Sequence, residues 1–299
     1  MYSQNKTNIS TKQFLDEIND AAEAIKNADR ILIGIGAGMT AAGGLSYSDP
    51  ELAKKWYPEY YSLGKHSISE IMGDFWPTML NAKNATAFWG FWAQHIHHIR
   101  YKAKALQPYR DLFEIVREKD YFLCSTNVDG QLEKAGFDKR KIFAPQGDYA
   151  LFQCEKPCSQ DVYDNKAMID TMLENMVSPL DINEQDTPHC PRCGRFLIPN
   201  LRCDYRFVEK PHMENLQAYQ EFLDKSEDNK LVLLELGVGF NTPGIIRLPF
   251  ERITADAANA KLIRINFEDA NVNPNIQSRS ISIREDIQQV LLSVRNKIS

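Results

Sequence analysis

A glycine-rich turn that directly follows an apolar run is the first segment of this 299-residue chain that could do chemistry. The run Ile31–Ile35 is rich in β-branched residues, the turn Gly36–Gly38 follows it, and small residues continue to Gly44 and Leu45. Glycines let the backbone approach a pyrophosphate closely, and free N–H groups at the start of a helix face its negative charge. The segment therefore predicts a parallel strand that enters a nucleotide-binding loop.

Polar side chains follow a second apolar run, Tyr121–Ser125. Ligands of open α/β sheets bind beyond the carboxyl ends of the strands, where the Asn127 amide and the Asp129 carboxylate could hydrogen-bond a sugar hydroxyl and a carboxamide. A helix N-cap is the alternative, because Asn and Asp favour that position. Gln146 follows another short strand; its amide can position a group but cannot act as a general base, and a plain turn residue is the alternative.

Two later segments have the same form. Gly237–Gly239 follow the apolar run Leu231–Leu236, and Asn266–Glu268 follow Leu262–Ile265. Each could be an ordinary loop. Two glycine-rich strand exits together with Asn266 in one chain favour a dinucleotide as the ligand.

Four of the six cysteines form two close pairs, Cys154/Cys158 and Cys190/Cys193. Each short knuckle can present two thiolates to one edge of a tetrahedron, which is typical of a zinc ribbon. Four thiolates leave no open position, so the predicted zinc is structural. The alternative is that His189 replaces one of the cysteines.

The other cysteines and a histidine cluster give weaker signals. Cys124 lies in an apolar run and is expected to be a buried strand residue, whereas Cys203 has no assigned role. His95 and His98 share a helical face, but no carboxylate or cysteine pattern accompanies them. We therefore expect a partly exposed helix there rather than a metal site.

The composition limits the class of protein. The net charge of −5 and the pI near 5.8 argue against a nucleic-acid partner, which would favour a basic face. No uninterrupted apolar run approaches the roughly 18 residues that a membrane span needs, and the first residues lack the apolar core of a signal peptide. We expect a cytoplasmic protein with no membrane or nucleic-acid partner.

Short apolar strands that alternate with helices must position these residues, which predicts an α/β fold: a Rossmann-like parallel sheet with helices on both faces. Residues 1–49, 100–149 and 206–299 form this domain, the aromatic-rich stretch 50–99 is a helical insertion, and the irregular stretch 150–205 is a small zinc-ribbon module. The expected strands are Ile31–Ile35, Tyr121–Ser125, Lys141–Ala144, Leu231–Leu236, Leu262–Ile265 and Ser280–Ile283. The expected helices include residues 11–29, a short one that ends near Gly136, Glu214–Leu223 and Ile287–Val294.

In chain order these segments resemble the sirtuin family over roughly residues 20–290. The resemblance implies the fold described above, with NAD as the dinucleotide. The motifs that carry it, with the usual family form in parentheses, are Gly36-Ala37-Gly38-Met39-Thr40-x3-Gly44-Leu45 (Gly-Ala-Gly-x-Ser-x3-Gly-Ile), Thr126-Asn127-Val128-Asp129 with Ala135-Gly136 (Gln-Asn-Ile-Asp with Ala-Gly), Gln146-Gly147 (His-Gly), Cys193-Gly194-x2-Leu197-x-Pro199 (Cys-Gly-x2-Leu-Arg-Pro), Phe207-Val208-Glu209 (Phe-Gly-Glu), and the adenosine-side segments Gly237-Val238-Gly239 and Ile265-Asn266.

Three departures from the family pattern fall where acyl-lysine chemistry would occur. Gln146 replaces the catalytic histidine, and loss of a general base slows a reaction by about 10²–10⁴-fold, so deacylation should be badly impaired. Tyr47–Asp49 replace an Asp-Phe-Arg segment, and Val208 places a branched side chain where an acyl-lysine strand would approach. The nucleotide site is spared. This pattern resembles the macrodomain-linked branch of sirtuins.

That branch implies NAD-dependent ADP-ribosylation of a protein with release of nicotinamide. It also implies a lipoylated glycine cleavage H-like carrier as the acceptor, a macrodomain hydrolase and a lipoate–protein ligase encoded in the same operon, and a link to oxidative stress. A strong base is not needed if the acceptor is already a carboxylate. The alternatives are an NAD glycohydrolase, a weak protein-lysine deacylase and a non-enzymatic NAD-binding module.

The resemblance also assigns roles to single residues. Asn127 and Gln146 would hold the nicotinamide ribose, and Asp129 would bind the carboxamide of nicotinamide. The expected contacts with NAD are Gly36, Ala37, Gly38, Thr40, Gly44, Leu45, Thr126, Asn127, Asp129, Gln146, Gly237, Val238, Gly239, Asn266, Phe267 and Glu268.

Overall fold

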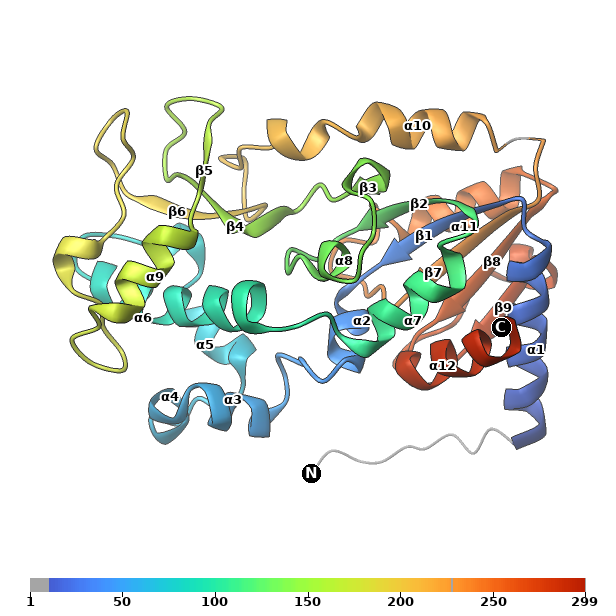
Figure 1. The fold of residues 1–299 in the computed structure, drawn as a ribbon, viewed down its shortest axis with the longest axis horizontal. Helices are drawn as coiled ribbons and strands as arrows, with labels where there is room; N and C mark the ends of the chain where they lie inside the picture. The colour runs from blue at the N-terminus through green and yellow to red at the C-terminus, as the bar shows by residue number, and fades with distance from the viewer. Residues whose placement is uncertain (1–10, 227, 299) are drawn as a thin grey trace.

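The computed structural model describes residues 11–226 and 228–298, and a parallel sheet of six strands is the largest element of this part of the chain (Figure 1). The strands are β1 (Arg30–Ile35), β2 (Asp120–Ser125), β3 (Ile142–Phe143), β7 (Leu231–Leu236), β8 (Ala260–Ile265) and β9 (Ser280–Ile283). Their spatial order is β3-β2-β1-β7-β8-β9. The chain therefore proceeds outward from β1 on one side and from β7 on the other, which makes the β1/β7 boundary the topological switch point at which such sheets bind ligands.

The register of the sheet brings the carboxyl ends of the central strands level. Ile35 pairs with Ser125 on one side and with Leu236 on the other, and Leu236 pairs with Ile265. The loops that follow these strands therefore meet at one edge of the sheet.

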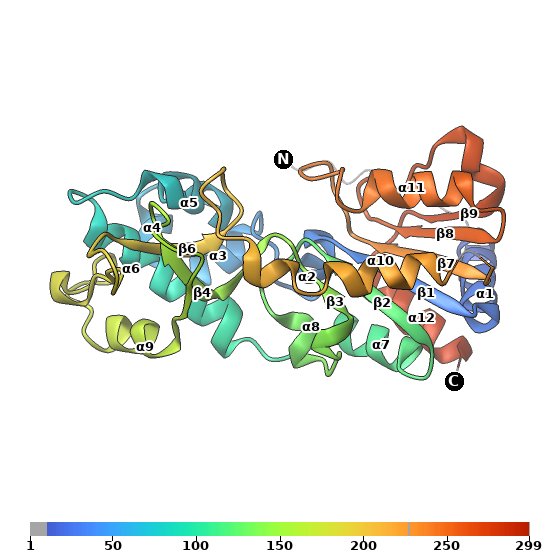
Figure 2. The same cartoon turned by 90° about the horizontal axis from the view of Figure 1, so that it is seen from above.

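Helices cover both faces of the sheet (Figure 2). Because strand side chains alternate, Ile31 and Ile33 belong to the apolar cluster of one face and Leu32 to that of the other. The first face is covered by α1 (Thr11–Asn27), α7 (Gln107–Val116) and α12 (Ile287–Ile298), and the second by α10 (Leu216–Asp224) and α11 (Arg247–Asp256). The short helices α2 (Ala37–Ala42) and α8 (Gln131–Lys134) follow β1 and β2.

The remaining elements form a second lobe beside the carboxyl edge of the sheet (Figure 1). An antiparallel sheet in the order β5-β4-β6 lies in this lobe, with β4 (Gly147–Cys154), β5 (Val162–Asp164) and β6 (Leu197–Leu201). Its α-helices are α3 (Pro50–Trp56), α4 (Pro58–Ser62), α5 (Ile68–Asp74), α6 (Ala85–Ile96) and α9 (Lys166–Glu174), and a π-helical segment, His97–Lys102, extends α6.

One apolar cluster holds this smaller lobe together. Trp89 and Trp92 of α6 belong to it with Phe152 of β4, Ile169 of α9 and Leu197 of β6, and all five are buried. The helical stretch and the cysteine-bearing stretch thus share a core. A helix that is buried all round, as α6 is, must lie inside such a core.

The fold class and most expected elements are confirmed. β7 and β9 have the expected bounds, and Cys124 is a buried residue of β2. The description of residues 150–205 as irregular was wrong, because β4, β5, α9 and β6 lie within or reach into this stretch. Helices α7 and α11 were not anticipated. None of the helices in the described part of the chain has the length and apolar character needed to cross a bilayer.

Candidate functional site

Two glycine loops touch at the switch point. The Gly38 N–H donates a hydrogen bond of 3.0 Å to the Gly237 carbonyl, and the Gly36 N–H donates one of 3.0 Å to Leu236. A Cβ atom on Gly36 would lie 2.5 Å from the Gly237 carbonyl oxygen, and one on Gly237 would lie 2.6 Å from the backbone of Gly38. Gly237 also has a φ of +61°. Side chains are excluded here, so the backbone itself forms the surface that a ligand would meet.

The first loop has little side-chain cover. Gly36 precedes α2 without a side-chain cap, and Ala37 is exposed. Gly44 has a φ of +90° with open space around its Cβ position, and Leu45 packs against the core of the smaller lobe. The loop therefore runs from the switch point to the smaller lobe.

A hydrogen-bond network joins the loops after β1 and β2. The Asn127 side-chain amide donates to the Gly36 carbonyl at 3.0 Å, to the Thr40 hydroxyl at 3.1 Å and to the Tyr109 hydroxyl at 2.9 Å. Thr40 in turn donates to the Asp129 carboxylate at 2.6 Å. Because Thr40 has one hydroxyl proton, Tyr109 donates in the 2.7 Å contact between their oxygens. Thr40, expected at the pyrophosphate, thus directs its hydroxyl to Asp129.

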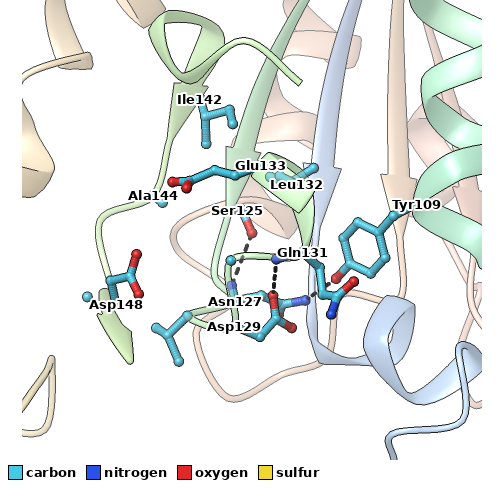
Figure 3. A pocket seen from close by; sticks show the side chains of 13 residues that line it. Tyr109, Ser125, Asn127, Asp129, Gln131, Leu132, Glu133, Ile142, Ala144 and Asp148 are labelled. Atoms are coloured by element: carbon cyan, nitrogen blue, oxygen red, sulfur yellow. Dashed lines mark hydrogen bonds between the residues drawn. The ribbon is translucent and has the colours of Figure 1, made fainter. Parts of the chain in front are cut away.

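Asp129 is the buried carboxylate of this network (Figure 3). Burial raises its pKa, while hydrogen bonds from Thr40 and from the Gln131 N–H at 3.0 Å oppose that effect. Burial also raises the pKa of Tyr109 well above its usual value, so the phenol stays protonated. The carboxylate is held by neutral donors and remains able to accept further hydrogen bonds from a ligand.

Two side-chain amides are open to a ligand. Within the described residues, the Asn127 carbonyl oxygen accepts no hydrogen bond, and the Gln146 side chain makes none. The Gln146 backbone carbonyl accepts from the Arg202 N–H at 3.0 Å. Gly147, with a φ of +112°, follows, and its Cβ position lies 2.1 Å from the Asn200 carbonyl oxygen. The backbone is thus fixed beside Gln146 while its amide is free.

A small cavity of about 50 Å³ lies beside these loops (Figure 3). Ser125, Asn127, Asp129, Gly147 and Asp148 are among its lining residues, whereas Gln146 is not. The cavity is far smaller than a dinucleotide. It is a recess between the loops that follow β2 and β3, next to the polar network.

The loops after β7 and β8 are tied together on the far side of the switch point. The Asn266 side chain donates to the Val238 carbonyl at 3.0 Å and accepts from the Glu268 N–H at 3.0 Å. Gly239 is exposed, and Phe267 is 69% exposed. Asn266 therefore positions Val238, and Phe267 presents a free aromatic ring.

Buried charges that the sequence analysis missed hold the same two loops. Arg247, 4% exposed, donates to the Val238 carbonyl at 3.4 Å and to the Asp269 carboxylate at 3.0 Å. Arg264 pairs with Glu235 at 2.8 Å inside the sheet, and both are fully buried. No local motif marks these residues, because their partners lie far away in the sequence.

The four paired cysteines form the predicted cluster. The sulfur atoms of Cys154 and Cys193 lie 3.6 Å apart, as do those of Cys158 and Cys190, and all four lie within 4.8 Å of one another. A tetrahedral zinc ion with Zn–S bonds of about 2.3 Å would space its sulfurs by about 3.8 Å, so the residues fit. All four are free thiols, and the His189 ring contacts the Thr187 carbonyl instead.

The segment expected to face an acyl-lysine strand is occupied from within. Val208 is 1% exposed. Its N–H donates to the Gln153 side chain at 2.9 Å, and its carbonyl accepts from the Asn200 side chain at 3.1 Å. Since both backbone groups are used, Val208 offers no partner to an extended peptide.

The prediction of a partly exposed helix at His95 was wrong. His95 is fully buried, with Nδ1 3.0 Å from the Tyr57 hydroxyl and Nε2 3.1 Å and 3.3 Å from those of Tyr47 and Tyr149. Burial lowers its pKa to about 3, so the ring is neutral. His98 instead stacks on Trp56. The histidines are part of the core, and no metal cluster includes them in the described residues.

Comparisons with known proteins support a shared origin of sequence and fold. No protein-family model matches the chain. It is 29% identical over 286 residues to the "Protein ADP-ribosyltransferase" of Staphylococcus aureus, which covers 93% of this chain and 88% of that protein. It is 29% identical over 259 residues to a "Probable bifunctional ADP-ribose hydrolase/ADP-ribosyltransferase" of Fusarium oxysporum f. sp. cubense, which covers 82% of this chain and 41% of that protein.

Solved structures of Sir2 homologues have the same fold. A complex of a Sir2 homologue with NAD has a TM-score of 0.56 at 15% identity, covering 94% of this chain and 95% of that one. A mutant Sir2 homologue bound to 2′-O-acetyl ADP-ribose has a TM-score of 0.61 at 15% identity, covering 93% and 95%. At these identities the likeness concerns the fold.

Proposed function

We propose that this chain, which has the sirtuin fold, is an NAD-dependent protein ADP-ribosyltransferase that releases nicotinamide and transfers ADP-ribose to an acceptor protein. The likeness to a named ADP-ribosyltransferase over 93% of the chain supports the enzyme class. The observation that carries the proposal is the open amide pair of Asn127 and Gln146 next to the buried Asp129. These groups can hold a ribose and a carboxamide, but neither amide can remove a proton.

The proposed reaction is a substitution at the anomeric carbon of the nicotinamide ribose. The bond between that carbon and the pyridinium nitrogen breaks, its electron pair neutralises the departing nicotinamide, and a bond to an acceptor oxygen forms. The transition state is oxocarbenium-like, as in other glycosyl transfers. The Asn127 carbonyl and the Gln146 amide hold the ribose hydroxyls, while Asp129 accepts a hydrogen bond from the carboxamide and so orients the leaving group.

The remaining parts of the site hold the rest of NAD. The touching glycine loops at Gly36 and Gly237 bring backbone close to the pyrophosphate, and Asn266 and Phe267 lie on the adenosine side. Positioning alone can supply a large part of the rate when the nucleophile is already an anion, so a carboxylate acceptor suits a site without a base. The four cysteines hold a structural zinc ion away from this chemistry.

We further propose the acceptor and the setting on the basis of the resemblance described above. The acceptor is a lipoylated glycine cleavage H-like carrier, and a macrodomain hydrolase of the same operon removes the modification. Such a cycle would operate in the cytoplasm and respond to oxidative stress.

Labelled NAD tests the proposal directly. The purified protein is incubated with adenine-labelled NAD and a lipoylated or unlipoylated carrier, and both protein-bound and free label are measured. Label on the carrier is expected, with Asn127→Ala and Gln146→Ala each at least about 10²-fold slower because the ribose is no longer aligned. Zinc content and thermal unfolding serve as controls for folding. Full activity in both variants would contradict the assigned roles.

The same experiment separates the alternatives. Free ADP-ribose without labelled carrier would indicate an NAD glycohydrolase, and an acylated sugar formed from an acyl-lysine peptide would indicate a deacylase. Intact NAD after incubation would indicate a non-enzymatic binding module.

A further inference from the structure

Arg100 lies between the two loops that carry the proposed ribose-binding amides. It belongs to the π-helical segment His97–Lys102, and its side chain is 14% exposed. π-Helical turns are rare and often occur at functional sites. Arg100 was not singled out from the sequence, because no motif surrounds it.

On one side, Arg100 grips the loop that follows β3. Its Nε donates to one oxygen of Asp148 at 2.8 Å and its Nη2 to the other at 3.1 Å. Asp148 also accepts from the Ala150 N–H at 2.7 Å. Because Asp148 is two residues beyond Gln146, this bidentate pair fixes the backbone that carries the Gln146 amide.

On the other side, Arg100 packs against the loop that follows β2. The Cβ position of Gly130 lies 2.4 Å from Cζ of Arg100, so only glycine leaves room for the guanidinium at this residue. Nη2 also lies 3.6 Å from the Glu133 carboxylate of α8. Gly130 directly follows Asp129, so the guanidinium touches the loop that carries both Asn127 and Asp129.

The segment that presents Arg100 is itself braced against α8. The Lys134 ammonium donates to the carbonyls of Ile99 at 3.0 Å and Ala103 at 2.8 Å. The Gln131 side chain accepts from the Leu106 N–H at 2.9 Å. Arg100 therefore has a fixed base from which to join the two loops.

We propose that Arg100 is a positioning residue that sets the distance between the Asn127 and Gln146 amides by clamping Asp148 against Gly130. A buried ion pair contributes little net stability compared with apolar residues, which argues that this one is kept for geometry. The proposal rests on the proposed function, since both amides are assigned to the nicotinamide ribose. The adenosine-side loops after β7 and β8 make no printed contact with Arg100 and should be unaffected.

The test compares R100M with R140M. Arg140 makes the same bidentate contact with Asp138, but within one loop and with its side chain 88% exposed, so it is a matched control. For R100M we expect kcat of nicotinamide release to fall about 10²-fold while the KM for NAD and the affinity for ADP-ribose stay within a factor of three. R140M should match the wild type. An unchanged kcat in R100M, or an equal loss in R140M, would overturn the proposal.

A double-mutant cycle distinguishes positioning from a general loss of structure. If Arg100 acts through Asp148, R100M combined with D148N should be no slower than R100M alone, whereas independent losses would multiply. Multiplied losses would overturn the proposal.

A structural measurement keeps the inference separate from the proposed function. If the wild type itself releases no nicotinamide, the proposed function fails, and crystal structures of wild type and R100M with ADP-ribose then decide the positioning claim. Displacement of the Gln146 loop relative to Asn127 would support it. An unmoved loop would overturn it.

Discussion

Thr40 shows, at the scale of one residue, how a single hydroxyl can order a site. Its proton goes to Asp129, and its oxygen accepts from Asn127 and Tyr109. The sequence could place Thr40 in a glycine-rich loop but could not show this orientation, since the partners are 69 to 89 residues away in the chain. Tyr109 was missed for the same reason.

The first prediction concerns the pH dependence of the reaction. The hydrogen bond from Thr40 lowers the pKa of Asp129, so Thr40→Val should raise that pKa. If the ionised carboxylate is needed, the acid limb of the kcat/KM profile then moves to higher pH. Thr40→Ser keeps the hydroxyl and should keep the limb in place. Superimposable profiles for the wild type and the valine variant would argue against a role for ionised Asp129.

The second prediction concerns the glycine contact at the switch point. Gly237→Ala would place a Cβ 2.6 Å from the Gly38 backbone at a φ of +61°, which costs about 1–3 kcal/mol for the strained backbone alone. We expect a lower Tm and loss of NAD binding by calorimetry. The control is Gly239→Ala, whose Cβ meets nothing within 4 Å. Normal NAD affinity in the Gly237 variant would show that this contact does not shape the ligand site.

At the scale of elements, local and distant information separate clearly. Strands such as Leu231–Leu236 are continuous apolar runs buried on both faces, so composition alone identified them. The pairs around Cys154 and Cys190 likewise announced the sulfur cluster. β5 has three residues and depends on pairing with β4, so no sequence period revealed it. The packing of α6 against this small sheet was equally invisible in the sequence.

The third prediction concerns metal removal. Cys154 and Cys190 are part of the smaller lobe's apolar cluster, so the metal site and that core should be lost together. Binding of structural zinc is worth about 10–16 kcal/mol in small peptides, which makes the holoprotein far more stable than the stripped form. We expect one zinc per chain by elemental analysis and a large drop in Tm after chelation or in Cys190→Ser. Cys203→Ser, outside the cluster, should retain zinc. A stripped protein with unchanged Tm would rule out a structural role.

At the scale of the whole molecule, the two lobes differ in what they contain. All four tryptophans of the chain, at positions 56, 76, 89 and 92, lie in the smaller lobe. His95 and His98, whose pKa values burial lowers to about 3 and about 4, lie there as well. Tryptophan fluorescence therefore reports on the smaller lobe alone, and acid should act on it first.

The fourth prediction follows from these histidines. His95 is neutral when folded but gains a proton below about pH 6.5 when unfolded, so the free energy of unfolding falls as the pH drops from 6.5 toward 3. Each such group contributes about 1.4 kcal/mol per pH unit. We expect the fluorescence-detected Tm to fall over this range, and to fall less steeply in His95→Gln than in the exposed control His66→Gln. Equal slopes would show that His95 does not drive the acid transition.

The path of the chain limits how this molecule can be divided. The polypeptide leaves the parallel sheet after β1 to build α3 to α6, returns for β2 and β3, and leaves again for β4 to β6 and α9. The smaller lobe is therefore woven from two separate excursions, not from one cassette. No single cut or graft can remove it or transplant it into another scaffold, and a chimaera that exchanges either excursion alone would leave half of a shared interior without its counterpart.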